Sequence, residues 1–214
     1  GAEPRVVYID RPATATATPS RVPASIARGP LRVLLAGDST SVESEQAWSN
    51  VPGVDLVGAE GRNGCPLIQP DSGWSVLYTP FTIDHCDWRL YVPQAVAGVA
   101  PDVVVASWGG FIPGDYRRAD GSVDWVREGG PVLDVVRASM SEFETAVAPA
   151  RVVWVTYPAT ELLSPDWVRL ADEARNDALW PLVFDGHCSA DMDRWLTDSV
   201  AGPLFHDGVH LNGP

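Results

Sequence analysis

The serine at position 39 follows a short apolar run, in the stretch LLAGDSTS at 34–41. A hydroxyl at the end of a buried strand can act as a nucleophile if a base removes its proton. The last residues contain such a base, because Asp207 and His210 stand three positions apart in DGVH. On a helical turn this spacing lets the carboxylate bind one imidazole nitrogen and leaves the other as proton acceptor. The pattern predicts a triad of Ser39, His210 and Asp207 for acyl-ester chemistry.

Each of these residues also has a purely structural interpretation. Ser39 could cap a helix that begins after it, because serine is favoured at the N-cap position. Asp207 and His210 could belong to a solvated terminal turn. Asp38 is expected to cap the turn by accepting backbone N–H groups rather than to take part in catalysis. The joint occurrence of Ser39 and the DxxH pair favours catalysis.

The apolar pattern predicts the elements that position these residues. Short apolar runs that end at Gly or Pro predict strands at 31–37, 54–59, 101–110, 150–158 and 181–186. Helices are expected after Ser39, at 88–99 with an interruption at Pro93, and at 132–147, 165–179 and 189–200. Alternating strands and helices indicate a three-layer α/β/α sandwich with a parallel sheet. Sites in such sheets lie at the carboxyl ends of the strands, where Ser39 falls.

Length and charge narrow the function classes. The 214 residues, 45% hydrophobic, suffice for one domain, which we place at 31–214. Residues 1–30 are expected to form a linker or extended arm, because the Ala/Thr/Pro-rich part at 11–30 has no apolar period. The net charge of −13 argues against nucleic-acid binding, since a phosphate backbone would be repelled. No apolar run approaches the length of a membrane span.

The three cysteines, Cys65, Cys86 and Cys188, form no CxxC pair. One disulfide with a leftover thiol and three reduced cysteines are both compatible with this odd count. The neighbouring histidines, His85 and His187, lack a third ligand at a suitable spacing, so no metal is expected. No cofactor is expected either.

GDS at 37–39, a glycine-containing loop at 58–64 and DxxH at 207–210 together resemble the SGNH (GDSL) hydrolase family. The resemblance implies a flavodoxin-like sandwich and carries Ser39, Asp207 and His210 over as the triad. It also implies an oxyanion hole made by the backbone N–H groups of Ser39 and of a glycine after the second strand. Gly64 is the expected glycine, with Gly61 and Gly58 as alternatives.

The third block of the family usually reads Gly-x-Asn, whereas this chain has SWGGF at 107–111. Either a backbone N–H of Gly109 or Gly110 or the indole N–H of Trp108 replaces the asparagine, or the hole has two donors. Our choice for the third donor is Gly109. Trp108, Phe111 and Asn63 are expected to line the substrate site, and the long polar segment 112–130 is expected to be a substrate loop.

A narrower resemblance rests on GC at 64–65, CDW at 86–88 and PDVVV at 101–105. These stretches look like the SGNH domains fused to bacterial membrane acyltransferases. The resemblance implies a Cys65–Cys86 disulfide with Cys188 free. It also implies an extracytoplasmic location, with the linker tethering the domain to the membrane.

The expected function is therefore a serine-dependent O-acyltransferase that moves acetyl or short acyl groups to cell-envelope glycans through an acyl-enzyme on Ser39. Its expected partners are an acyl donor, supplied by a membrane acyltransferase domain, and a glycan acceptor. One alternative is a secreted carbohydrate or lipid esterase of the same fold. The other is a catalytically weak glycan-binding module.

Overall fold

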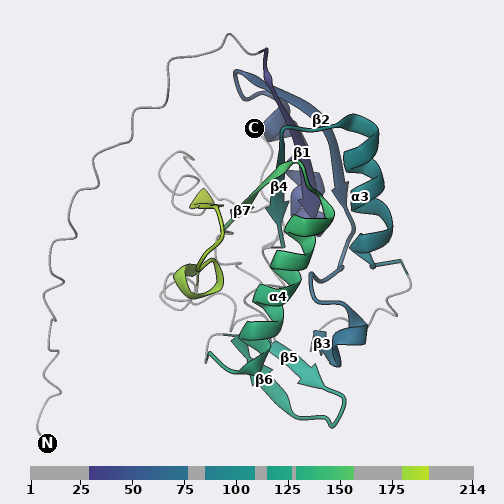
Figure 1. The fold of residues 1–214 in the computed structure, drawn as a ribbon, viewed down its shortest axis with the longest axis vertical. Coiled ribbons are helices and arrows are strands. Elements are labelled where there is room, and N and C mark those ends of the chain that lie inside the picture. Colours follow the sequence, from purple (N-terminus) through teal and green to yellow (C-terminus); the bar gives the residue numbers. More distant parts are fainter. Residues whose placement is uncertain (1–28, 77–84, 109–114, 127–128, 157–179, 193–214) are drawn as a thin grey trace, which may run out of the picture.

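The central sheet positions the serine. The computed structural model describes residues 29–76, 85–108, 115–126, 129–156 and 180–192. Its main sheet has the strand order β2-β1-β4-β7-β8, and all neighbouring strands are parallel (Figure 1). These strands are β1 (Leu31–Gly37), β2 (Val54–Gly61), β4 (Val103–Ser107), β7 (Arg151–Val155) and β8 (Ser189–Ala190). The parallel sheet confirms the predicted fold class.

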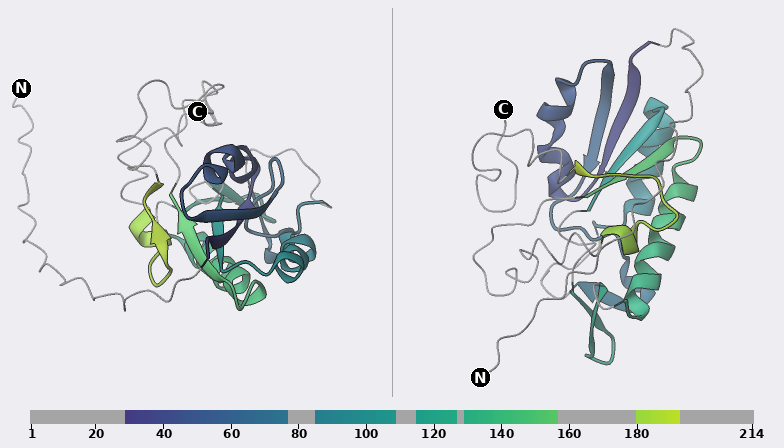
Figure 2. Two further views of the ribbon diagram at one scale, coloured as in Figure 1. Left: turned by 90° about the horizontal axis from the view of Figure 1, so that it is seen from above. Right: turned by 90° about the vertical axis from the view of Figure 1, so that its left-hand side faces the viewer.

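Helices cover both faces of this sheet (Figure 2). The helices α1 (Ser39–Glu43) and α2 (Glu45–Ser49) lie on one face, and α3 (Trp88–Val99) and α4 (Pro131–Ala146) lie on the other. Alternate residues of β1 pack toward the helices on opposite faces of the sheet, because side chains alternate across a strand. Leu35 packs with Trp48 of α2, whereas Leu34 belongs to the cluster that contains Phe143 of α4. Burial on both faces explains why β1 reads as a continuous apolar run.

Aromatic rings fill the core between α4 and the sheet. The Phe143 ring lies 5.1 Å from Trp88, 5.2 Å from Trp108 and 5.5 Å from Trp154, in edge-to-face arrangements. Such pairs stabilise a core beyond the apolar area that they bury. Trp74, Trp88, Trp154 and Trp180 are buried, as expected from the sequence. Trp167, Trp195 and the side chain of Trp125 lie outside the described residues.

A second, antiparallel sheet lies beyond the carboxyl ends of β1 and β4 (Figure 1). Its strand order is β3-β5-β6, with β3 (Trp74–Val76), β5 (Asp115–Arg118) and β6 (Val123–Trp125), and the short helix η1 (Pro70–Ser72) precedes it. Arg118 of β5 contacts both neighbouring strands. Its guanidinium carbon lies 4.6 Å from the centroid of the Trp74 ring in β3, and its NH2 group pairs with Asp124 Oδ2 of β6 at 2.8 Å. The segment 112–130 is therefore not a plain loop, because it contains β5 and β6.

The structure corrects three predicted elements. Residues 180–183 are helical, not a strand. Among the described residues, the last strand of the sheet is β8, which occupies the start of the helix expected over 189–200. Helix α3 runs through Pro93 without a break. Proline removes one backbone hydrogen bond, and the burial of Val92 and Val96 compensates for that loss. The helix predicted at 165–179 lies outside the described residues, as do residues 1–28 of the arm predicted at 1–30.

The disulfide that the resemblance implied is present. It joins Cys65 and Cys86, and Cys188 is a free, exposed cysteine. A structural disulfide is typical of proteins outside the reducing cytosol. Over the ranges that the structure describes, no helix combines the length and apolar character needed to cross a membrane.

Candidate active site

Ser39 is the first residue of α1, directly beyond the carboxyl end of β1. Asp38 is the N-cap of this helix, because its Oδ1 accepts a hydrogen bond from the Thr40 backbone N–H at 2.8 Å. The interpretation of Ser39 as the cap is therefore wrong, and the interpretation of Asp38 as the cap is confirmed. Asp38, Thr40 and Ser41 are buried, whereas Ser39 is partly exposed. The fold thus leaves this one hydroxyl of the turn within reach of a substrate.

The register of the sheet brings three strand ends level with the serine. Gly37, the last residue of β1, pairs with Gly61 of β2 on one side and with Ser107 of β4 on the other. The backbone N–H of Arg62 donates to Gly37 O at 3.2 Å, and that of Asp38 donates to Ser107 O at 3.1 Å. The loops that follow β2 and β4 therefore begin at the same edge of the sheet as Ser39.

Two glycines permit this close packing. A Cβ on Gly61 would lie 2.2 Å from Ser41 Oγ and 2.4 Å from Asp38 O. Gly37 has a φ of +155°, and a Cβ there would lie 1.6 Å from Ser107 O. Neither contact is possible for a side-chain carbon, so both positions require glycine. The lack of a side chain at Gly61 lets the turn that carries Ser39 pack directly against β2.

Buried hydroxyl groups hold the backbone under Ser39. Thr40 Oγ1 donates to Asp38 Oδ1 and lies 3.1 Å from Ser107 Oγ. Ser41 Oγ donates to Asp38 O at 2.8 Å. Sequence reasoning missed Thr40, Ser41 and Ser107 as positioning residues. The signal for two of them was the run of three hydroxyl residues at 39–41.

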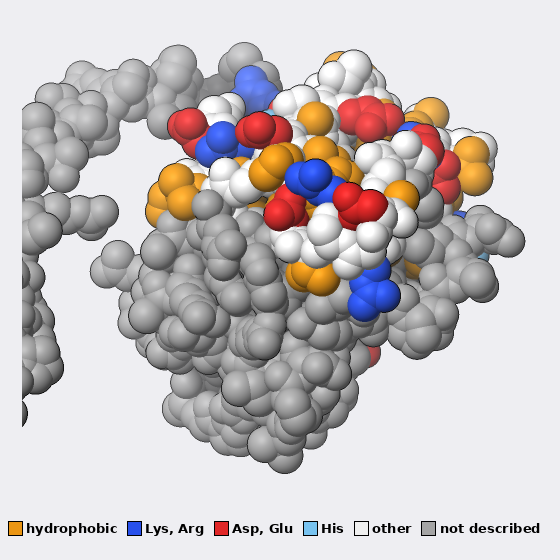
Figure 3. Space-filling view, turned by 90° about the horizontal axis from the view of Figure 1, so that it is seen from below, with side chains coloured by type: hydrophobic (Ala, Val, Ile, Leu, Met, Phe, Trp, Pro, Cys, Tyr) orange, Lys and Arg blue, Asp and Glu red, His pale blue; other side chains and the backbone are white. Residues whose placement is uncertain are grey.

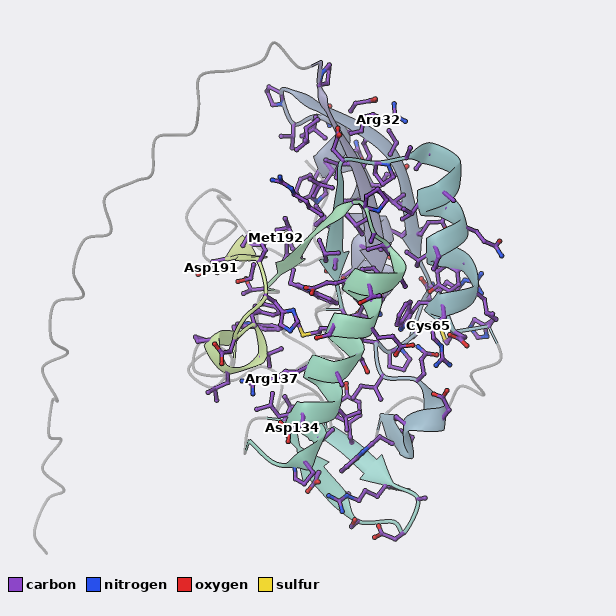
Figure 4. The ribbon with its side chains drawn as sticks, in the orientation of Figure 1. Arg32, Cys65, Asp134, Arg137, Asp191 and Met192 are labelled. Carbon is purple, nitrogen blue, oxygen red and sulfur yellow. A yellow bond between two sulfur atoms is a disulfide. The ribbon has the colours of Figure 1, made fainter. Side chains whose placement is uncertain are left out.

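The expected oxyanion donor Gly64 lies in a turn closed by a hydrogen bond from Cys65 N to Arg62 O at 3.1 Å. Gly64 has a φ of +71°, which favours glycine. Among the described residues, no backbone carbonyl accepts its N–H. The next residue, Cys65, is bonded to Cys86, which lies two residues before α3 (Figure 4). The turn is thus held from two sides, as preorganised donors must be.

The other predicted site residues fall into two groups. Asn63 is exposed beside Gly64. Trp108 is only 1% exposed, and its ring packs on Phe143 and Trp154 in the core, so its packing gives no support to a role in the substrate wall. The remaining predicted residues lie outside the described part of the chain, and their roles stay predictions: Asp207, His210, Gly109, Gly110 and Phe111.

Potential metal ligands also meet near this loop. Ligand atoms of Cys65, His85 and Cys86 lie within 4.8 Å of one another. The two sulfur atoms are bonded to each other, however, and a metal needs thiolates. The group therefore does not suit a metal ion while the disulfide is intact.

Charged groups cluster at the start of α3. Hydrogen bonds from the Arg89 side chain lower the pKa of Asp87, the N-cap of α3. Arg89 also pairs with Asp71 of η1 at 2.9 Å, which connects the two segments. Burial is the main factor that raises the pKa of Tyr91 to about 12.

A cavity of about 340 Å³ lies at the carboxyl ends of β7 and β8. The stacked rings of Trp180 and Phe184 contribute an apolar wall. Thr156 and Asp191 contribute polar groups and are joined by a 3.1 Å hydrogen bond. An apolar wall with a few polar groups suits a small organic ligand.

Comparisons with known proteins agree with this architecture. No protein-family model matches the chain, and the search of curated proteins found no match. A solved structure from Slackia heliotrinireducens, assigned to the SGNH hydrolases, is similar with a TM-score of 0.52 and 20% identity over 85% of this chain and 90% of that one. The lipase/acylhydrolase from Enterococcus faecalis has a TM-score of 0.50 and 15% identity over 85% and 87%. The chain therefore has the fold of the SGNH hydrolases.

Proposed function

We propose that this chain is a serine-dependent acyl-ester enzyme with Ser39 as its nucleophile, His210 as the base and Asp207 as the residue that orients His210. The position of Ser39 carries the proposal. It is the partly exposed residue at the carboxyl end of a central strand in an SGNH hydrolase fold, and its neighbours in the turn are buried. Active sites of parallel α/β sheets form at this edge.

The proposed reaction has two half-reactions. Ser39 Oγ attacks the carbonyl carbon of the donor ester while His210 takes the hydroxyl proton. The N–H groups of Ser39 and Gly64 stabilise the oxyanion that forms. The carbonyl then reforms, the ester C–O bond breaks, and the departing alcohol receives the proton from His210. In the second half, His210 removes a proton from an acceptor hydroxyl, which attacks the acyl-Ser39 carbonyl. The carbonyl bond to Ser39 Oγ then breaks, the acyl group stays on the acceptor, and Ser39 Oγ takes the proton back from His210.

The acceptor decides between transfer and hydrolysis. Our first choice is an O-acyltransferase that moves acetyl or short acyl groups to cell-envelope glycans outside the cytoplasmic membrane. In this scheme a membrane acyltransferase domain supplies the acyl donor and tethers the domain. The sequence stretches around Cys65, Cys86 and 101–105 support it, and the disulfide fits the location. A carbohydrate or lipid esterase is the second choice, supported by the lipase/acylhydrolase fold relative.

Chromogenic acetyl esters test the proposal. We expect p-nitrophenyl acetate turnover to fall by about 10³-fold or more in Ser39→Ala. Ser49→Ala is the matched control, because Ser49 is an exposed serine in α2 whose hydroxyl donates to Gln46 O of the same helix. Mass spectrometry of the quenched reaction should show an acetyl group on Ser39. Equal rates for the native chain and Ser39→Ala, with no acetyl adduct, would refute the enzyme and leave the glycan-binding module. Adding oligosaccharide then separates transfer from hydrolysis by the acetylated product.

A further inference from the structure

Arg62 stands beside the serine turn. It is the first residue after β2, and its backbone N–H donates to Gly37 O, two positions before Ser39. The turn that presents Gly64 begins at Arg62. The Arg62 side chain is only partly exposed. Arg62 therefore belongs to the rim of the candidate active site, between the nucleophile and the start of α3.

Two groups hold the Arg62 side chain in place. Its guanidinium carbon lies 3.8 Å from the centroid of the Tyr91 ring in α3. Its NH1 group donates to the backbone oxygen of His85, next to the Cys65–Cys86 disulfide. A cation over an aromatic face is a favourable contact. A side chain fixed in this way loses little conformational entropy when it binds a ligand.

Both of these partners are uncharged. Elsewhere, Arg32 pairs with Asp55, Arg89 with Asp87 and Asp71, and Arg118 with Asp124. No carboxylate of a described residue lies within 4.0 Å of the Arg62 guanidinium. Glu60 and Asp87 are nevertheless close enough to Tyr91 to contribute to its raised pKa. A guanidinium has five N–H donors, so donors remain for a ligand.

The overall charge of the chain makes a single well-placed cation important for binding an anion. The chain carries a net charge of −13, so it repels anions in general. On the coloured part of the surface in Figure 3, acidic, basic and apolar side chains are mixed. An anionic substrate therefore needs a particular cation to hold it. A planar guanidinium is well matched to the two oxygens of a carboxylate or to a phosphate.

We propose that Arg62 is a specificity-determining residue whose guanidinium binds a carboxylate or phosphate group of the glycan that Ser39 deacylates or acylates. The inference rests on the proposed function and names its substrate class as acidic glycans. Binding of the anion at Arg62 orients the sugar so that one of its ester or hydroxyl groups faces Ser39 Oγ.

Matched acetylated sugars test this proposal. The neutral substrate is acetylated glucose, the carboxylate is acetylated glucuronic acid, and the phosphate is acetylated glucose 6-phosphate. We expect Arg62→Gln to lower the ratio of anionic to neutral kcat/KM by about 10- to 100-fold, mainly through KM. The two acidic sugars show whether the carboxylate or the phosphate is preferred. Arg151→Gln is the matched control, because Arg151 is an exposed arginine at the opposite, amino end of β7.

A binding measurement separates this inference from the proposed function. The Ser39→Ala chain should bind the acetylated uronic acid more tightly than acetylated glucose by calorimetry. Adding Arg62→Gln should abolish that preference, whereas Arg62→Lys should restore part of it because the charge returns without the planar fork. A general loosening of the loop would weaken both ligands alike and overturn the inference. Equal binding of the two sugars by Ser39→Ala would also overturn it. If Ser39→Ala turned over esters as fast as the native chain but still preferred the acidic sugar, only the proposed enzyme function would be refuted.

Discussion

The hydroxyl oxygens of Thr40 and Ser107 lie 3.1 Å apart, although 67 positions separate them in the chain. Both side chains are buried. Ser107 is the last residue of β4, and Thr40 lies in the first turn of α1. The contact therefore fastens the turn that carries Ser39 to the neighbouring strand. A nucleophile must stay in place during the reaction, and this contact contributes to that order.

Replacing Thr40 by Val should expose the importance of this contact. The two side chains have similar shapes, but Val leaves Asp38 Oδ1 and Ser107 Oγ without their Thr40 partner. We expect a loss of about 1–3 kcal/mol in the free energy of unfolding, measured with urea, and a lower p-nitrophenyl acetate rate. Thr145→Val is the control, because Thr145 is exposed on α4 and should change stability by less than about 0.5 kcal/mol. Identical urea midpoints for both variants would contradict the prediction.

Gly61→Ala should displace the serine turn. The new methyl group would collide with Asp38 O, a backbone atom that cannot rotate away. We expect a stability loss of about 1–3 kcal/mol from overpacking. We also expect a rate loss of about 10²-fold, because the nucleophile moves. Gly98→Ala in α3 is the control.

A Cβ on Gly98 meets nothing within 4 Å. Alanine there should stabilise the helix by about 0.5–1 kcal/mol, since glycine costs backbone entropy in a helix. If thermal melts and ester assays show that the chain tolerates Gly61→Ala as well as Gly98→Ala, the proposed steric role of Gly61 is wrong.

Reduction of the Cys65–Cys86 disulfide should affect stability and activity together. The bond spans a sequence separation of 21, for which loop-closure entropy predicts a stabilisation on the order of 3 kcal/mol. It also holds Cys65, the neighbour of Gly64. We expect the Cys65→Ser, Cys86→Ser double variant to melt at a lower temperature and to turn over p-nitrophenyl acetate more slowly. Cys188→Ser should match the native chain in both assays. A native protein whose mass does not rise by two hydrogens on reduction would disprove the disulfide.

The Asp87–Arg89 pair should make a small, pH-dependent contribution to stability. Side-chain hydrogen bonds from Arg89 lower the pKa of Asp87 in the folded state below its ordinary 3.8. The contribution is therefore complete above the unfolded pKa and is lost as the pH falls through the lower folded pKa. Asp87→Asn keeps a good N-cap but removes the charge. The stability difference from the native chain should be under about 1 kcal/mol near neutral pH, because the pair is partly exposed. It should shrink as urea titrations move below about pH 4. A difference that grows on acidification would contradict this assignment.

Sequence patterns predicted the parts of the fold where burial is strongest. The run at 31–37 is apolar because both faces of β1 are covered, and the structure places β1 there. The strand predicted at 181–186 was wrong, because a short apolar run fits a strand or a helix equally well. Trp180, Val183 and Phe184 are buried at i, i+3 and i+4, which is the helical period. Strand β5, with the sequence DYRR, has no apolar alternation that could have predicted it.

Some features of the candidate site could be predicted from the sequence, and others could not. The position of Ser39 at a strand end followed from local sequence, as did the cap at Asp38. The contact of Thr40 with Ser107 did not, because it arises from the register of β1 against β4 rather than from nearby residues. The roles of Asp207 and His210 stay predictions, since they lie outside the described residues.

The disulfide makes a closed ring of the chain between Cys65 and Cys86, and β3 belongs to that ring. A protease that cuts once inside the ring produces two polypeptides that remain covalently joined. Such a nicked molecule would migrate as a single band on a denaturing gel until a reductant is added. The ring therefore keeps the glycine turn beside Ser39 attached to α3 even after its own backbone has been cleaved.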